Sequence, residues 1–471
     1  MLFNSLEFLI FFPVVTLIYY FLPHHVRWIH LLLSSCIFYM FFIPLYILIL
    51  LLTILVDYYA GIWIERSDDK RKKKYLVLSI ISTCLILFIF KYTDFFYSNV
   101  QSLSHLLGFN YPQKTMHIIL PIGLSFHTFQ SLSYVIEVYK GRQRAERHFG
   151  FYALYVMFYP QLVSGPIERP QNLLLQLKQV KSFELSNLIR GMRLILFGLF
   201  VKMAVADNLG YYVDQIYDNP DRYNSESVIT GLLFYSFQIY GDFFGYSTIA
   251  LGCALCMGFT LMDNFKNPYF SKSFTEFWQR WHISLSTWFR DYVYIPLGGN
   301  KVSWKFWLLN ILIVFALSGF WHGASWTFVI WGLLHGIVYI SEKAISKFKN
   351  KIVILSLRWQ RIQDPFRVIL TFILVSILWI LFRARNTDQV SAIIHALLSP
   401  TQNGDNIFIE SKVWILLFAF VLFDFLLLKN RFDRWCSGIH PVVRWSVYAV
   451  LIFSILALSS VNQFPFIYFQ F

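Results

Sequence analysis

The stretch FALSGFWHGASW (Phe315–Trp326) places one titratable side chain, His322, between two glycines and two tryptophans. The stretch lies inside a long hydrophobic segment, where we expect little water. Burial disfavours the charged imidazolium and leaves a neutral base whose ring nitrogens still need partners. Whether His322 has a structural or a catalytic role therefore depends on the residues that the rest of the chain places around it.

The composition indicates that a lipid bilayer is the main solvent of this chain. Its 471 residues are 57% hydrophobic and only 14% charged, whereas soluble chains carry about 25% charged residues. Apolar runs of roughly 20 residues, the length that crosses a hydrocarbon core of about 30 Å, recur from end to end. We therefore predict an all-α, polytopic transmembrane protein that forms one membrane domain over residues 1–471.

The positive charge falls between the apolar runs. The formal net charge is +14, but the Lys and Arg residues form no stripe of the kind that lines a nucleic-acid groove, so we expect no nucleic-acid partner. Short basic clusters lie instead at 66–74, 142–147 and 343–351, which is typical of cytoplasmic loops beside anionic lipid. On this basis the third span ends in the cytoplasm and the N-terminus is extracytoplasmic.

About eleven segments have the character of membrane spans. The N-terminus lacks a basic region and a small-residue cleavage site, so we interpret the first segment as a retained span. Two further segments, 117–139 with His127 and 151–170, are too polar or too broken by Pro and Gly for ordinary spans. Irregular backbone at membrane depth survives only where protein buries it or where it lines water, so we expect both to be re-entrant or cavity-lining. The expected spans are 6–22, 28–43, 45–64, 75–97, 187–206, 228–240, 305–321, 324–340, 366–382, 412–428 and 443–460.

Residues 263–300 are more polar than the rest of the chain. From Ser273 onward, aromatic and aliphatic residues recur at spacings of three and four, which predicts a helix with one apolar stripe. Arg280, His282 and Asp291 are distributed around the remaining face. An interfacial amphipathic helix, with tryptophans at the lipid headgroups and arginines reaching toward water, explains this pattern without any catalytic role.

For His322 the residues alone leave two interpretations open. Gly319 and Gly323 allow close helix approach, so the histidine could join two helices by a hydrogen bond worth about 1 kcal/mol. Ionisable residues are costly to keep at membrane depth, however, and are functional candidates by default. His335 lies 13 residues further on, would face another direction if one straight helix carried both histidines, and is interpreted as structural.

Several common catalytic motifs are absent from the sequence. It contains no H-E-x-x-H, no P-loop, no G-x-S-x-G elbow and no Rossmann glycine pattern. Cys253–Cys256 matches C-x-x-C only formally, because it lies in an apolar segment without a second pair. Five cysteines without framework spacing argue against a disulfide scaffold. We therefore predict neither a metal-binding motif nor a bound cofactor.

Two blocks around the histidines resemble a known enzyme family. YFSKSFTEFWQRWHISLSTWFRDYVYIPLGGN (269–300) and LSGFWHGASWTFVIWGLLHG (317–336) are similar to the membrane-bound O-acyltransferase (MBOAT) family, and within it to the alginate O-acetyltransferase AlgI branch. The resemblance continues at 120–141, 159–171, 196–209 and 464–471, and thus covers essentially the whole chain. It implies core acyltransferase motifs within 117–340 and C-terminal spans within 366–471.

The resemblance implies an enzyme that moves an acyl group to a hydroxyl, with signature histidines at His282 and His322. In this family the second histidine lies at the centre of a tunnel through the membrane, where a cytoplasmic donor meets an acceptor presented from outside. Members of this branch modify secreted or cell-wall polysaccharide, often with a periplasmic or surface partner protein that completes the transfer. The implied location is the bacterial cytoplasmic (inner) membrane, with many passes through the lipid.

Acyl transfer from a thioester is chemistry that a desolvated histidine can perform. We hypothesise that His322 is the general base for the acceptor hydroxyl, or for a serine of a partner, a role worth roughly 10²–10⁴-fold. His282 would orient the acceptor or stabilise the oxyanion. Acetyl-CoA or a carrier-protein thioester would serve as donor and co-substrate. The residues expected around the substrates are Trp321, Trp326, Arg280, Asp291, Asp242 and His127.

Three alternatives stay open at this point. A D-alanyl transferase of the DltB type shares the two-histidine arrangement. A transporter also combines broken segments with intramembrane His and Asp residues, although obvious inverted repeats are absent. A scaffold of a polysaccharide export complex would tolerate the loss of the histidines.

Overall fold

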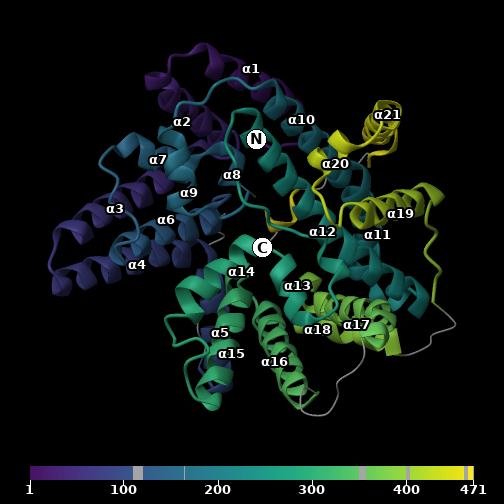
Figure 1. Ribbon diagram of the computed structural model, residues 1–471. Helices are drawn as coiled ribbons and strands as arrows, with labels where there is room; N and C mark the ends of the chain where they lie inside the picture. Colours follow the sequence, from purple (N-terminus) through teal and green to yellow (C-terminus); the bar gives the residue numbers. More distant parts are fainter. Residues whose placement is uncertain (110–119, 164, 350–356, 399–403, 461–464, 470–471) are drawn as a thin grey trace. The chain divides into compact units, whose positions relative to one another are not determined.

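In the computed structural model, residues 1–109, 120–163, 165–349, 357–398, 404–460 and 465–469 are described (Figure 1). Throughout these ranges the regular structure is helical, and the β-pairing is limited to an isolated bridge between Tyr223 and Asp405. The prediction of an all-α chain is therefore confirmed.

Seven helices in the described ranges are long and apolar enough to cross a membrane. Other expected spans are shorter or interrupted; the segment expected at 187–206, for example, is α-helical only to Leu199 and continues as a π-helix. The number of about eleven spans stays a prediction. The seven helices are Pro44–Arg66, Asp69–Lys91, Ser225–Cys256, Trp304–His322, Trp326–Lys347, Gln363–Arg383 and Pro441–Leu458.

The described residues gather into two compact units, and one membrane domain over residues 1–471 stays a prediction. Unit 1 comprises Met1–Met192 and Ala250–Met262, and unit 2 comprises Arg193–Ile249 and Asp263–Phe471. The helices of unit 1 are α1 (Leu6–Phe21), α2 (His24–Met40), η1 (Pro44–Tyr46), α3 (Ile47–Arg66), α4 (Asp69–Lys91), α5 (Thr93–Leu106), α6 (Leu124–Tyr139), α7 (Phe149–Met157), α8 (Tyr159–Leu162) and α9 (Pro170–Lys178).

Two helices, α10 (Leu185–Leu199) and α12 (Ser225–Cys256), carry residues of both units. Ninety-four per cent of the most apolar window of α12 is buried inside the protein, so this helix is a core element. The other helices of unit 2 are η2 (Phe200–Ala206), α11 (Asp207–Asp218), η3 (Pro220–Arg222), η4 (Pro268–Phe270), α13 (Phe274–Arg280), α14 (Ile283–Phe289), η5 (Arg290–Tyr294), α15 (Trp304–His322), α16 (Trp326–Lys349), α17 (Leu357–Arg383), α18 (Thr387–Leu398), α19 (Ser411–Leu426), α20 (Phe432–Gly438), α21 (Pro441–Leu458) and η6 (Ile467–Phe469).

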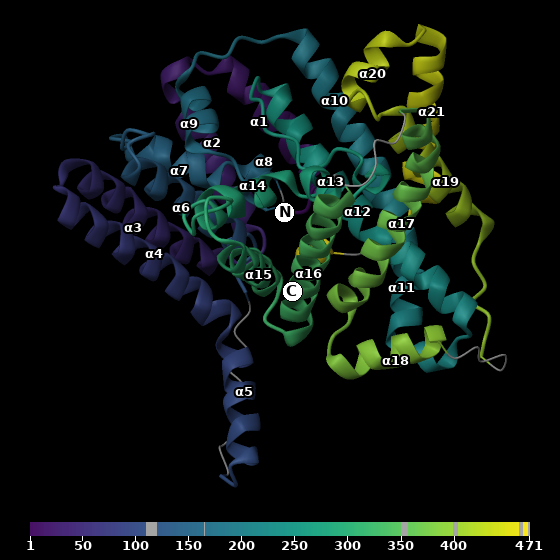
Figure 2. The same ribbon diagram turned by 60° about the horizontal axis from the view of Figure 1, so that its bottom comes forward.

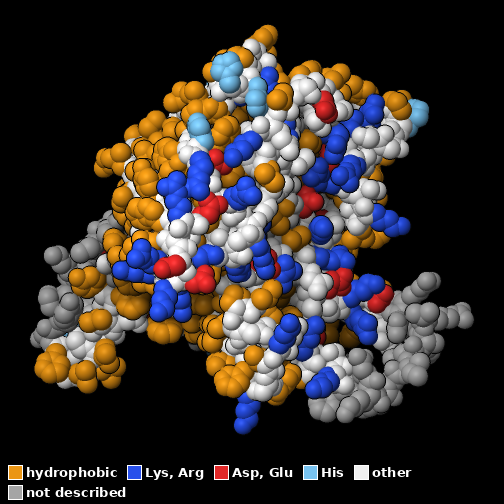
Figure 3. Space-filling model, turned by 60° about the vertical axis from the view of Figure 1, so that its left-hand side comes forward, with side chains coloured by type: hydrophobic (Ala, Val, Ile, Leu, Met, Phe, Trp, Pro, Cys, Tyr) orange, Lys and Arg blue, Asp and Glu red, His pale blue; other side chains and the backbone are white. Residues whose placement is uncertain are grey.

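The surface has the character of a protein solvated by lipid. Large hydrophobic side chains such as Leu6, Leu78 and Phe453 are more than half exposed. Figure 3 shows a face on which Lys and Arg side chains gather beside surface that is almost wholly hydrophobic. Asp68 caps α4 by accepting from Arg71 N, and most of the basic residues at the start of this helix are exposed: Lys70, Arg71, Lys73 and Lys74. Charge at a helix end next to an apolar surface is what a membrane boundary requires.

The segment at 151–170 is broken, as predicted. α7 ends at Met157, and Phe158 leaves the helical conformation (φ −51°, ψ 109°) before the short α8. The carbonyl of Tyr155 loses its helical donor at this break but accepts hydrogen bonds from Gln130 Nε2 and Gln161 Nε2. At this break two buried amide side chains therefore satisfy the freed carbonyl, as is required away from water.

The other segment expected to be irregular, 117–139, is described only from residue 120. It enters α6 through Gly123, whose φ of 76° lies in the left-handed region. A Cβ atom there would lie 2.6 Å from the carbonyl oxygen of Leu162. Glycine therefore suits this position for two reasons: it adopts the positive φ, and it has no side chain to clash with Leu162. The start of α6 thereby packs against the end of α8, and residues 117–119 lie outside the described residues.

α15 and α16 form a tightly packed hairpin, and they lie side by side in Figures 1 and 2. A Cβ atom at Gly319 would lie 2.2 Å from the carbonyl oxygen of Phe328, and one at Gly332 would lie 2.2 Å from that of Phe315. Backbone therefore meets backbone at this crossing. The small-residue packing expected of Gly319 is confirmed, with Gly332 as its partner across the hairpin.

We predict that Gly319→Ala destabilises the protein by about 1–3 kcal/mol, because the added methyl group overpacks a crossing made of backbone. In a helix without such a neighbour the same change is stabilising or neutral. Gly438→Ala is the matched control, since a Cβ atom at that position meets nothing within 4 Å. The thermal midpoint in detergent, measured for both variants, is the readout. Equal midpoints would contradict the close approach.

Candidate active site

His322 is the last residue of α15 and lies in unit 2. Gly323 caps the helix, donating its N–H to the carbonyl of Gly319, and α16 begins three residues later. A Cβ atom at Gly323 would lie 2.1 Å from the ring of Phe328. The imidazole is thus held at the closed end of the α15–α16 hairpin by residues that tolerate no added atoms.

Aromatic rings surround the His322 imidazole, which is 4% exposed. Its ring centroid lies 4.9 Å from Trp321, 5.1 Å from Phe382, 5.3 Å from Trp331 and 5.6 Å from Tyr468. These rings come from α15, α16, α17 and η6. They exclude water from the histidine, which is the condition under which a base and the dipoles around it act most strongly.

His282 lies where the predicted amphipathic helix breaks. The helix expected from Ser273 ends as α13 at Arg280, and α14 starts at Ile283. Between them, His282 has a φ of 42°, a left-handed conformation that costs a residue with a side chain roughly 1–2 kcal/mol. A spacing pattern does not reveal such a break, because the apolar stripe continues through it.

Asn264 holds the strained backbone at His282 in place. Its carbonyl accepts from Ile283 N at 2.9 Å, and its side-chain oxygen accepts from Ser284 Oγ at 2.6 Å. Asn264 Nδ2 in turn donates to Ser247 Oγ of α12 at 3.2 Å. Strain that neighbouring hydrogen bonds fix in this way is common at functional sites.

The His282 side chain is buried in the same aromatic cluster. It is 1% exposed and packs edge-on against Phe243 at 4.7 Å. Trp321 and Tyr468 each lie 6.4 Å away, measured between ring centroids. Burial lowers the pKa of His282 to about 3, so this imidazole is neutral at physiological pH.

Trp321 and Tyr468 contact both histidines and so define one site. Tyr468 belongs to η6 near the C-terminus, and the preceding residue anchors it: Ile467 N donates to Asp242 Oδ2 at 2.6 Å. Asp242, on α12, also pairs with Lys202 at 2.6 Å. The structure therefore brings together four of the predicted residues, which are His282, His322, Trp321 and Asp242.

Sequence reasoning missed Tyr468 and Lys202. Lys202 is completely buried and lies 2.6 Å from both Asp207 and Asp242. The sequence did carry a signal for Lys202, because it is the one cation in the otherwise apolar run LFGLFVKMAVAD. A cation buried in such a run needs buried counter-charges. Tyr468 lies in the family-like ending 464–471, but nothing there indicated a place in the site, because its role depends on a contact with residues more than a hundred positions earlier.

The other predicted site residues have different environments. Arg280 pairs with Glu276 at 2.5 Å and Asp291 pairs with Arg290 at 2.8 Å. Trp326 is 54% exposed at the start of α16. His127 belongs to unit 1, where its Nε2 lies 3.1 Å from the hydroxyl of Thr53. These residues stay predictions as substrate contacts.

His335 is enclosed by a ring cage of its own. Its ring centroid lies 4.5 Å from Trp331, 5.1 Å from Phe274 and 5.2 Å from Trp278. It is fully buried, and neither ring nitrogen has a hydrogen-bond partner among the described residues. Trp331 contacts both His335 and His322, so the two histidine environments share one ring.

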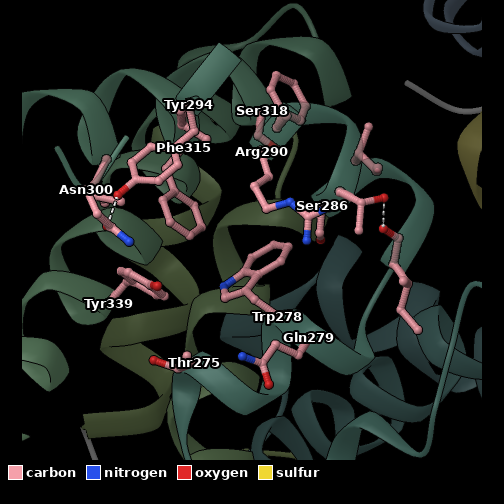
Figure 4. A pocket seen from close by; sticks show the side chains of 16 residues that line it. Thr275, Trp278, Gln279, Ser286, Arg290, Tyr294, Asn300, Phe315, Ser318 and Tyr339 are labelled. Atoms are coloured by element: carbon pink, nitrogen blue, oxygen red, sulfur yellow. Dashed lines mark hydrogen bonds between the residues drawn. The ribbon is translucent and has the colours of Figure 1, made fainter. Parts of the chain in front are cut away.

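A cavity of about 430 Å³ opens beside the site in unit 2 (Figure 4). Trp278 and Phe315 line it, together with the polar side chains of Gln279, Ser286 and Arg290. In Figure 4 the Arg290 side chain extends toward Ser286 and Trp278. Mixed apolar walls and a few polar groups at this volume are typical of small-molecule sites.

Two residues that line the cavity are close to the histidines in the chain. Ser318 lies four residues before His322, on the same face of α15. Ile283 directly follows His282. The histidines themselves are not among the lining residues.

The pKa of His282 predicts a pH dependence of stability. The unfolded histidine binds a proton below about pH 6.5, whereas the folded one stays neutral to about pH 3, so acidification favours unfolding. Between pH 7.5 and pH 5, the His282 imidazole should therefore lower the free energy of unfolding of the wild type by about 2 kcal/mol.

His282→Gln should remove that part of the pH dependence, and unfolding midpoints of the purified proteins across this range measure it. His25→Gln, a change at an exposed histidine, serves as the control. The same pH slope in wild type and His282→Gln would show that the imidazole is not held neutral.

Comparison with known proteins relates the whole chain to acyl-transferring enzymes. Residues 142–383 match the membrane-bound O-acyltransferase family. The chain is 33% identical to a probable alginate O-acetylase AlgI from Pseudomonas putida, over the full length of both proteins. It is 34% identical to a peptidoglycan O-acetyltransferase from Helicobacter pylori, covering 78% of this chain and 73% of that protein. A teichoic acid D-alanyltransferase from Bacillus subtilis is 29% identical over 62% of this chain and 74% of its own length.

Proposed function

Since this chain belongs to the membrane-bound O-acyltransferase family and is an O-acyltransferase, we propose that it transfers acetyl groups from a cytoplasmic thioester to hydroxyls of a cell-surface polysaccharide. The observation that carries the proposal is the pair of buried histidines, His282 and His322, which share contacts with Trp321 and Tyr468. Two imidazoles in one dry aromatic cluster suit proton transfer and charge stabilisation at a reacting carbonyl.

His322 is the general base in this proposal. It takes the proton of the attacking hydroxyl while a C–O bond forms at the acyl carbon and the C–S bond of the thioester breaks. The proton then passes to the departing sulfur, which leaves as a thiol. His282 donates from its neutral ring to the developing oxyanion or orients the acceptor, a contribution of about 3 kcal/mol for one well-placed donor.

The cavity beside α15 takes the thioester arm of the donor, either acetyl-CoA or a carrier-protein thioester. Its walls combine Trp278 and Phe315, which pack on an aliphatic arm, with Gln279 and Arg290, which bind amide or phosphate oxygens. The acceptor approaches from the other side of the membrane, with or without a surface partner protein. In this proposal the enzyme lies in the bacterial cytoplasmic membrane.

The test is acyl transfer by membranes that contain the full chain. Radiolabelled acetyl-CoA is supplied on the cytoplasmic side, and label on polymer is counted. We expect His322→Ala to lower the rate by at least 10²-fold at equal protein abundance, because general-base catalysis is worth roughly 10²–10⁴-fold.

His335→Phe is the matched control for this experiment. That histidine is equally buried on the same hairpin, and its ring nitrogens make no hydrogen bond in the described part of the chain. We expect it to keep transfer close to wild type. Wild-type transfer by His322→Ala would exclude the base assignment.

The similarity to a D-alanyltransferase makes the acyl group the second variable to test. Mass analysis of surface polysaccharide from cells with and without the protein distinguishes an added acetyl group from an added alanyl group. A transporter would instead move solute without changing the polymer, and its activity would not depend on the thioester.

A further inference from the structure

A carboxylate that pairs with no cation among the described residues lies inside unit 1. Asp57 is 0% exposed on α3, nine residues from the end of the candidate span at Arg66 and thus roughly 13 Å along the helix. No Lys, Arg or His side chain of the described residues forms an ion pair with it. Asp57 belongs to unit 1, whereas the histidine cluster belongs to unit 2.

Hydroxyl groups from a neighbouring helix surround the carboxylate. Ser79 Oγ donates to Asp57 Oδ1 at 2.6 Å, and Thr83 Oγ1 lies 3.1 Å from Oδ1 and 3.2 Å from Oδ2. Both residues lie on α4 and are 1% exposed. Of these two hydroxyls, Thr83 Oγ1 alone reaches the second carboxylate oxygen, at 3.2 Å.

Two further hydroxyls belong to the same cluster. Ser131 of α6 interacts with the Asp57 carboxylate, and Tyr152 of α7 interacts with Ser131. Both residues are 0% exposed. Their oxygen atoms keep lone pairs that can bind a ligand.

The four helices that supply these groups pack against one another. α3, α4, α6 and α7 lie together in Figure 1, and contacts join α3 to the other three. Asp57, Ser79, Thr83, Ser131 and Tyr152 thus place one carboxylate and four hydroxyls around one point. An isolated charge at such a place costs several kcal/mol unless it is neutralised.

We propose that this cluster binds a single monovalent cation, and that the cation is Na⁺. Carboxylate and hydroxyl oxygens are hard ligands, which suit hard cations rather than transition metals. One carboxylate supplies one negative charge, so a monovalent ion balances it whereas a divalent ion leaves an excess charge buried. Binding ties α3, α4, α6 and α7 together and stabilises unit 1.

The test is the thermal stability of the purified full chain in detergent. Unfolding midpoints are measured in about 200 mM NaCl, KCl and choline chloride, so that ionic strength is constant. We expect a midpoint roughly 5 °C higher in Na⁺ than in choline, because a ligand that binds only the folded state stabilises it. Potassium should give a smaller shift.

Asp57→Asn keeps the shape of the side chain and removes the charge, so the Na⁺ response should disappear. Asp424→Asn is the matched control: Asp424 is also a buried carboxylate, but it accepts from Tyr240 Oη and Asn267 Nδ2 in unit 2. That variant should retain the Na⁺ response of the wild type.

Ser131→Ala provides a second route if Asp57→Asn fails to fold. It removes one proposed ligand while the carboxylate keeps its bonds to Ser79 and Thr83, so the half-saturating Na⁺ concentration should rise at least tenfold. An equal response of the wild type to Na⁺, K⁺ and choline would overturn the proposal and identify Asp57 as a protonated structural acid. A Na⁺ response that survives in Asp57→Asn, or an unchanged half-saturating Na⁺ concentration in Ser131→Ala, would overturn it as well.

Discussion

The contact on which the histidine site depends is the crossing of α15 and α16 at Gly319 and Gly332. Because each glycine meets the carbonyl oxygen of the opposite helix, the two helices approach more closely than any side chain would permit. This approach places Trp331 of α16 against His322 of α15. The aromatic wall that keeps water from the histidine therefore follows from the absence of two Cβ atoms.

The second histidine is positioned by a different device. His282 occupies a left-handed turn that its own side chain disfavours, and the hydrogen bonds of Asn264 hold that turn. The two histidines thus come from separate elements, and they meet through Trp321 and Tyr468. A site assembled from a helix end, a strained turn and a chain terminus can be rigid only if each part is fixed by buried contacts.

Much of the helical framework could be predicted from the sequence, because apolar runs end abruptly where polar or small residues begin. The span expected at 305–321 is observed as Trp304–His322, between Ser303 and Gly323. The break at His282 could not be predicted, because the spacing of apolar residues is the same whether or not the backbone changes its φ angle there. Tyr468 was also beyond reach, because its place is set by Asp242 far away in the chain.

The crowding around the glycines has a genetic consequence. At Gly323 the obstacle to a larger residue is the ring of Phe328, so a second mutation to a smaller side chain can restore the fit. At Gly319 and Gly332 the obstacle is main-chain oxygen, which no substitution elsewhere can shrink. Intragenic suppressors should therefore be recoverable for the first position and not for the other two, and the hairpin crossing can evolve only by moving its helices.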